Sequence, residues 1–182
     1  EEFLKKEMTE GQTLGFDGRV ISTGIGLNLE KALKEKNNKI VYGKDLAGEL
    51  WEERPELPSG KVYALSEEIM GVSVERKLAQ VREKMEKVGA EGFLLSKLDD
   101  IMWLFNIRGC DVECNPVALS YAYITKEESI LFIQKEALGS EIRAYLAKEN
   151  ILVKEYTEIM EYLKALPEGC RVLADKRYCS FA

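Results

Sequence analysis

Residues Leu98 to Ile124 read LDDIMWLFNIRGCDVECNPVALSYAYI, and three kinds of sequence follow one another in this stretch. The apolar first part predicts a short helix or turn that places Trp103 and Phe105 in the core. A polar loop follows and closes at Asn115 and Pro116, where the chain becomes rich in β-forming residues. A helix, a loop and a strand in succession are the first indication of an α/β domain.

The sequence downstream extends this pattern. The segments ALSYAYIT and SILFI are two β runs separated by Lys126, Glu127 and Glu128, which predicts a hairpin. The segments SEIRAYLAKEN and TEIMEYLKALPEG predict helices, and EGFLLSKL, ILVKEY and CRVLAD predict strands. Because strands and helices alternate from Glu91 onward, we expect a mixed β-sheet with flanking helices and an inserted hairpin.

A helix is also expected upstream, beginning at Ser73. Its apolar residues recur in steps of four and three along one face, at Val74, Leu78, Val81, Met85 and Val88. Gly89 follows and can end the helix, because glycine tolerates the left-handed conformation. The apolar seam is too short for a stable coiled coil, so packing on a sheet is the better interpretation.

The first third of the chain has the pattern of a partial α/β unit. It offers a strand around Leu14 to Phe16, a helix beginning at Ser22 or Thr23, and the strand-like segments KIVYG and KVYAL. The pattern restarts between Ser66 and Ser73. We therefore expect two domains, residues 1–68 and residues 69–182, and the abrupt start and end suggest a piece of a longer protein.

Composition limits the function. The chain has 182 residues and a formal net charge of -6, with its lysines scattered among acids, which argues against a nucleic-acid partner. No apolar run approaches the length of a membrane span, and the acidic start is unlike a signal peptide, so we expect a cytoplasmic protein. The sequence has no histidine. Mechanisms that depend on an imidazole, such as a Ser-His pair, are therefore not available to this chain alone.

The four cysteines allow one alternative, a small zinc-dependent domain. Without a secretory signal they are expected to be reduced thiols. Their spacing, Cys110 with Cys114 and Cys170 with Cys179, does not follow a regular zinc pattern. We therefore predict no metal site and no catalytic residue in this chain, and packing roles for Cys170 and Cys179.

The opening stretch resembles the middle domain of the three-domain aminopeptidase P family, the Xaa-Pro aminopeptidases. The residues in register with the motif of that family are Leu98, Asp99, Ile101, Trp103, Leu104, Asn106, Arg108, Gly109, Asp111, Asn115, Pro116 and Val117. Weaker similarity in LGFDGRVIS, LWEERPELPSGKVYAL and GVSVERKLAQVREKM extends the resemblance over almost the whole chain. Cys110 and Cys114 depart from the family, whose members often carry a hydroxyl or a ring there.

The resemblance implies a creatinase N-terminal-like (ribonuclease H-like) domain preceded by part of a similar domain. It also implies a parent enzyme that releases an N-terminal residue before proline, with two divalent ions (manganese, zinc or cobalt) in a C-terminal pita-bread domain. The metal ligands of the family are two aspartates, one histidine and two glutamates of that domain, and no position here matches them. The implied partners are the catalytic domain, proline-containing peptides and a second copy in a homodimer.

Two interpretations of the polar loop remain open. In the functional one, Asn106, Arg108, Asp111 and Asn115 face a substrate cleft or a domain interface, since an arginine fork can orient a carbonyl or a carboxylate. In the structural one, Arg108 pairs with Asp111 or Glu113 and Asn115 caps a turn. The expected function is that of a noncatalytic part of an Xaa-Pro aminopeptidase, and the alternative is a stand-alone peptide- or protein-binding module.

Overall fold

The computed structural model describes residues Glu1–Ala182, which form two compact units. Unit 1 comprises Glu1–Glu56 together with Asp175–Ala182, and unit 2 comprises Leu57–Ala174. The expected domain limit at 68/69 lies inside unit 2. Compact units and domains of common ancestry need not coincide, so residues 1–68 and 69–182 remain a prediction about domains.

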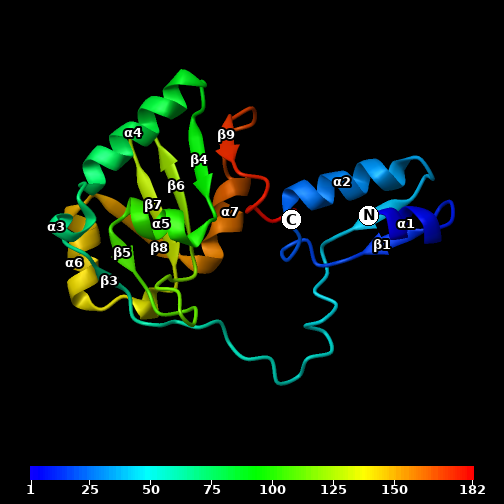
Figure 1. The fold of residues 1–182 in the computed structure, drawn as a ribbon, viewed down its shortest axis with the longest axis horizontal. Helices are drawn as coiled ribbons and strands as arrows, with labels where there is room; N and C mark the ends of the chain where they lie inside the picture. Colours follow the sequence, from blue (N-terminus) through cyan, green and yellow to red (C-terminus); the bar gives the residue numbers. More distant parts are fainter. The chain divides into compact units, whose positions relative to one another are not determined.

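Unit 2 is built on a five-stranded mixed sheet with the order β8-β7-β6-β4-β9 (Figure 1). Its strands are β4 (Gly92–Leu95), β6 (Ser120–Thr125), β7 (Ser129–Ile133), β8 (Ile151–Glu155) and β9 (Val172–Ala174). Strand β6 runs antiparallel to β4 and β7, whereas β8 and β9 run parallel to their neighbours. The predicted mixed α/β sheet and its β6–β7 hairpin are thus confirmed.

Helices cover both faces of this sheet. They are α3 (Glu67–Met70), α4 (Val74–Lys87), α5 (Leu98–Leu104), α6 (Ser140–Lys148) and α7 (Ile159–Lys164), with short 3-10 turns η1 (Lys135–Ala137) and η2 (Tyr156–Glu158). A second small sheet pairs β3 (Tyr63–Ala64) antiparallel with β5 (Ile107–Arg108). This pair ties the segment before α3 to the chain that leaves α5.

Strand alternation divides the core of unit 2 into two clusters. In β7, Leu131 and Ile133 face the larger cluster, to which α4, α5 and α6 contribute. Ile130 and Phe132 face the opposite way, where Ile159 and Tyr162 of α7 cover the sheet. Successive side chains of a strand point to opposite faces, so a strand that is buried on both faces is apolar throughout.

Helix α4 follows the predicted pattern. The Ser73 hydroxyl accepts a hydrogen bond from the Arg76 N–H at 3.2 Å and caps the helix. Gly89 has a φ of 65° just beyond the helix end. Val74, Leu78 and Met85, with Val81 partly buried, belong to the larger core cluster, which confirms packing on the sheet. Val88 was expected on the same face, but it follows the last residue of the helix and is 52% exposed.

The expectation of two aromatic core anchors on α5 is half correct. Phe105 is completely buried, but Trp103 is 47% exposed. Ile101, Met102 and Leu104 occupy the inward positions of this short helix. Trp103 therefore lies on the outer side.

Unit 1 contains a small parallel β-α-β arrangement. Its elements are α1 (Glu2–Glu7), β1 (Thr13–Gly15), α2 (Thr23–Lys34) and β2 (Lys39–Val41). Strands β1 and β2 pair in parallel, and α2 is the connection between them. Phe181 packs edge-on against Tyr42 with ring centroids 4.8 Å apart, which joins the C-terminal residues to this unit. None of the helices combines the length and the apolar composition that crossing a bilayer requires.

Candidate functional site

The candidate site is the segment from Asn106 to Asn115, which we call the 106–115 loop. It follows α5 directly, and Asn106 turns the chain with a φ of 53°. Asparagine is one of the few residues that adopt this left-handed conformation readily. The turn sends the chain into β5, which pairs with β3.

Asn106 is buried, with 3% of its surface exposed, and its side chain is fully engaged. Its Oδ1 accepts a hydrogen bond from the Lys77 ammonium at 2.5 Å, and its Nδ2 donates to the Val72 carbonyl at 3.1 Å. The amide thus links the end of α5 to the segment that leads into α4. Its role here is to hold the backbone.

Arg108 is half-buried and points back toward α5. Its guanidinium donates to the carbonyls of Met102 at 3.2 Å and Ile107 at 2.7 Å, and it lies 3.7 Å from the sulfur of Met70. The expected pairing with Asp111 or Glu113 is absent, because these backbone carbonyls take the guanidinium instead. Such contacts leave the positive charge of Arg108 without an acidic partner.

Asp111 braces the loop from within. One carboxylate oxygen accepts the Gly60 N–H at 2.6 Å and the other accepts the Leu119 N–H at 2.7 Å. The backbones approach closely at this point, since a Cβ on Gly60 would lie 2.9 Å from the carbonyl carbon of Cys110. Asp111 therefore links the middle of the loop to the segment before β3 and to the residue that precedes β6.

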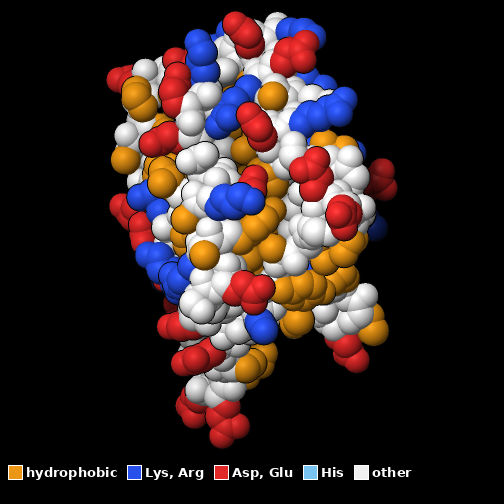
Figure 2. Space-filling view, turned by 90° about the vertical axis from the view of Figure 1, so that its left-hand side faces the viewer, with side chains coloured by type: hydrophobic (Ala, Val, Ile, Leu, Met, Phe, Trp, Pro, Cys, Tyr) orange, Lys and Arg blue, Asp and Glu red, His pale blue; other side chains and the backbone are white.

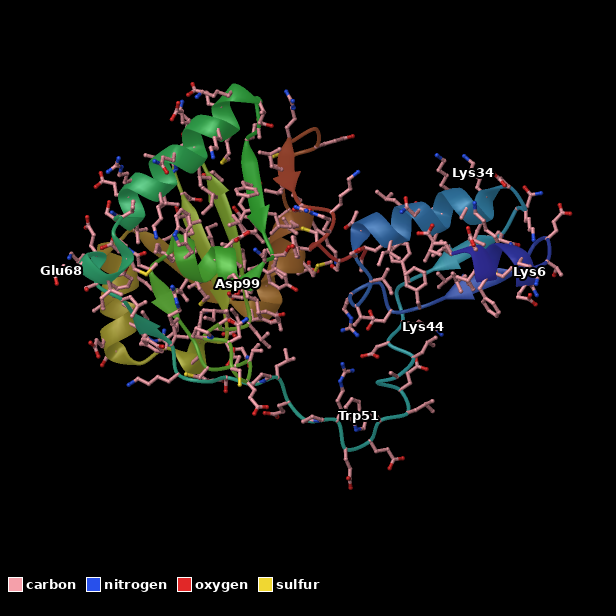
Figure 3. The ribbon with its side chains drawn as sticks, viewed as in Figure 1. Lys6, Lys34, Lys44, Trp51, Glu68 and Asp99 are labelled. Atoms are coloured by element: carbon pink, nitrogen blue, oxygen red, sulfur yellow. The ribbon has the colours of Figure 1, made fainter.

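Asn115 lies at the exposed end of the loop. Its backbone N–H donates to the Val112 carbonyl at 3.2 Å, and its side-chain amide lies 3.5 Å from the Asp99 carboxylate of α5, which Figure 3 labels. Cys114, immediately before it, has a φ of 59°. A tight turn of this kind presents side chains to solvent while the backbone bonds to itself.

The structure thus divides the four predicted site residues. Asn106 is buried, Arg108 and Asp111 are half-buried, and Asn115 is exposed. They do not form one cluster around a common point. Their polar groups mostly bond to the backbone of the chain itself.

Lys77 is the residue of this region that the sequence patterns did not single out. It lies on α4 with only 1% of its surface exposed, and it contacts both Asn106 and Trp103. The sequence does contain a signal. Lys77 lies three residues after Val74 and directly before Leu78, so it is a charged residue on the apolar face of the helix.

The candidate metal ligands of this chain are its acidic and cysteine side chains, since it has no histidine. No group of three or more cysteine, aspartate or glutamate side chains could hold a metal ion. All four cysteines are free thiols, with Cys110 and Cys114 exposed.

The outer surface beside the loop is partly apolar. Trp103 on α5, Tyr63 on β3 and Ile69 on α3 are all exposed, and Ile69 is the most exposed of them at 71%. Figure 2 shows the side of unit 2 on which α3 and α6 lie, where hydrophobic atoms reach the surface in the middle of the face among charged side chains. Exposed apolar groups rimmed by charge are typical of interaction surfaces.

Fold and site together define an α/β domain whose 106–115 loop is held by its own side chains. Residues 53–182 match the creatinase/prolidase N-terminal domain family. The chain belongs to this family, which confirms the resemblance found in the opening stretch.

Two relatives are similar in sequence along most of this chain. The chain is 34% identical over 178 residues to a probable Xaa-Pro aminopeptidase P of Coprinopsis cinerea, covering 97% of this chain and 28% of that protein. A probable Xaa-Pro aminopeptidase P of Podospora anserina is 34% identical over 164 residues, covering 88% of this chain and 24% of that protein.

A solved structure is similar as well. It is a crystal structure of X-prolyl aminopeptidase from Caenorhabditis elegans, described as a cytosolic enzyme with a di-nuclear active site. It superposes with a TM-score of 0.83 at 33% identity, over 90% of this chain and 27% of the other. The chain therefore spans little more than a quarter of the length of the relatives that it matches.

Proposed function

We propose that this chain is a noncatalytic N-terminal part of a metal-dependent Xaa-Pro aminopeptidase, whose 106–115 loop packs on the catalytic domain and limits the access of peptides. The observation that carries the proposal is identity of 33% to 34% along nearly the whole chain to proteins named as such enzymes. The aminopeptidase releases the N-terminal residue of peptides whose second residue is proline.

The chemistry of this proposal belongs outside the chain. Two divalent ions, such as manganese, zinc or cobalt, would supply the activated water, and the C. elegans relative is described as having a di-nuclear active site. The residues of this chain do not fit such a centre, because they include no histidine and no cluster of candidate ligands. Its contribution is therefore binding and positioning.

The form of the loop supports this role. Asn106 and Asp111 fix the backbone of the loop, which supports one arrangement of the exposed residues from Val112 to Asn115 that follow Asp111. A loop held on a rigid sheet is a common location for recognition. As parts of the same proposal, the enzyme is a cytosolic homodimer and the loop meets proline-containing peptides or the catalytic domain.

An activity assay tests the proposal. The purified chain, supplied with manganese and an Xaa-Pro dipeptide, should give no turnover, whereas a longer chain from the same gene should cleave the dipeptide. Turnover by the chain alone would contradict the assignment.

A loop variant tests the role in access. In the longer chain, Asn115→Ala should raise the KM for Xaa-Pro peptides several-fold with kcat nearly unchanged, because the exposed amide is removed and no buried contact is lost. Glu127→Ala, in the exposed β6–β7 turn, is the matched control and should leave KM unchanged. Equal KM values for both variants would remove the loop from the proposal.

The alternative is a stand-alone peptide- or protein-binding module. The exposed apolar side chains of Trp103, Tyr63 and Ile69 favour it, because such a surface could bind a partner in trans. A reading frame that stops after Ala182 would support the module, and one that continues into a metal-binding domain would support the aminopeptidase.

A further inference from the structure

Lys77 is the one charged side chain among the buried residues of the chain. It extends from the apolar face of α4 toward the end of α5. Burial of an ammonium without a carboxylate partner costs free energy, and such residues are rare. Contacts of the ammonium must therefore offset the free energy of its burial.

The ammonium makes three contacts with two residues, Trp103 and Asn106, at the start of the 106–115 loop. It donates to the Trp103 carbonyl and, at 2.5 Å, to Asn106 Oδ1. It also lies 4.4 Å from the centre of the Trp103 ring, which attracts a cation through its π face. All three contacts lie at the point where Asn106 turns the chain with its positive φ.

The charged groups around Lys77 are few. The charge of Arg108 on β5 opposes that of Lys77 and lowers the pKa of its amine. A hollow of about 270 Å³ beside Asn106 is lined by Glu67 of α3, by Lys148 of α6 and by Glu149, which follows that helix. Tyr145 of α6 lines the same hollow and donates its hydroxyl to the Phe105 carbonyl at 3.1 Å.

We propose that Lys77 is a positioning residue for the 106–115 loop: its buried amine holds Asn106 and the end of α5, and its protonation state sets how tightly the loop is closed. The inference rests on the proposed function only in that the loop is the surface assigned to substrate access. The hydrogen bonds to Trp103 and Asn106 exist in this chain regardless of what the loop meets.

The direction of the pH effect follows from linkage. Burial, and then the charge of Arg108, lowers the pKa of Lys77 to about 8. A local opening that exposes the amine to water returns its pKa toward the usual value of 10.5. In the open form of the loop, the Lys77 amine therefore binds its proton more tightly than in the closed form. Raising the pH above 8 shifts the equilibrium toward the closed form. The shift ends above pH 10.5, where the amine is neutral in both forms.

Hydrogen exchange measures this effect. The protection of the backbone amides of the 106–115 loop, corrected for the intrinsic exchange rate, should rise about tenfold in the wild-type chain between pH 7 and pH 9. The sequence contains no histidine, so no imidazole contributes to this profile. A flat wild-type profile would overturn the proposal without any variant.

Variants assign the profile to Lys77. Lys77→Met should flatten it and leave the loop less protected than wild type at pH 9, because Asn106 Oδ1 then lacks its donor. Lys77→Arg should also flatten it, since a guanidinium stays charged throughout this range. Lys84→Met, an exposed lysine on the same helix, should retain the tenfold rise.

The outcomes are separable from those of the aminopeptidase assay. A rise that persists in Lys77→Arg would overturn the role of Lys77 whether or not the longer chain cleaves peptides. A chain that shows the Lys77-dependent rise, while the longer form has no aminopeptidase activity, would retain this inference and lose only the proposed function.

Discussion

At the scale of single residues, the loop depends on a few side chains that bond to backbone. Asp111 alone satisfies two N–H groups, those of Gly60 and Leu119. Hydrogen bonds to a charged acceptor are stronger than neutral ones, and losing the acceptor leaves both donors unsatisfied. The carboxylate therefore stabilises the loop whatever the loop recognises.

Replacing Asp111 measures that contribution. Asp111→Ala should lower the free energy of unfolding by about 2 kcal/mol, because two charge-assisted hydrogen bonds at a half-buried site are lost. Urea denaturation followed by circular dichroism provides the measurement. Glu113→Ala, an exposed acid of the same loop, is the control and should change stability by less than about 0.5 kcal/mol. Equal effects of the two substitutions would show that Asp111 acts only as surface charge.

The residue types of the 106–115 loop mark it as a candidate site, but they do not predict which atoms its side chains contact. The polar residues Asn106, Arg108 and Asp111 were recognised from sequence. The partners of Arg108 and Asp111 are largely backbone atoms, which have no sequence signature. The pattern does not single out Lys77, because a lysine among charged helix residues is normally solvated.

At the scale of elements, α2 shows how close packing reverses an ordinary preference. Gly26 is buried within this helix, where an alanine would normally be favoured by about 1 kcal/mol. A Cβ at Gly26 would overlap the Phe181 ring. The missing side chain is what lets the C-terminal residues pack on α2 inside unit 1.

Gly26→Ala should therefore destabilise unit 1, by about 1 to 3 kcal/mol, since overpacking outweighs the helix preference. Hydrogen exchange of the α2 amides reports on this unit separately from unit 2. Gly43→Ala, in the same unit and with open space around its Cβ position, should leave those amides nearly unchanged. Unchanged exchange in Gly26→Ala would mean that Phe181 is not packed on the helix in solution.

The elements themselves were largely readable from the sequence, because hydrophobic periodicity reports burial directly. The helix from Ser73 and the β6–β7 hairpin appear where they were expected. The exposure of Trp103 does not follow from the sequence, because the run from Ile101 to Phe105 is apolar throughout and does not show which residue faces outward. The pairing of β3 with β5 has no local signal, since each strand has two residues and their partners are distant in the chain.

At the scale of the whole molecule, buried titratable groups give stability a dependence on pH that composition does not suggest. The folded state binds the Lys77 proton less tightly than the unfolded state, because burial lowers its pKa to about 8. It binds the Tyr145 proton more tightly, since burial and the charge of Glu149 raise the pKa of that hydroxyl to about 12. Burial likewise holds the pKa values of Tyr123 and Tyr156 well above the usual range.

The lowered pKa of Lys77 and the raised pKa of Tyr145 have opposite effects, so the stability of unit 2 should pass through a maximum as the pH rises. Between pH 8 and 10.5 the unfolded state takes up the Lys77 proton that the folded state has released, so this residue makes stability rise with pH, by about 1.4 kcal/mol from pH 7 to 9. Above pH 10 the unfolded tyrosines ionise first, and the stabilisation that Tyr145 provides is lost as the pH passes 12.

Urea denaturation of the wild type, Lys77→Met and Tyr145→Phe across pH 7 to 11 tests both the rise with pH and the later fall. The difference between wild type and Lys77→Met cancels the shared effect of the net charge and should rise from pH 7 to 9. A constant difference would mean that the Lys77 amine is solvated in the folded chain.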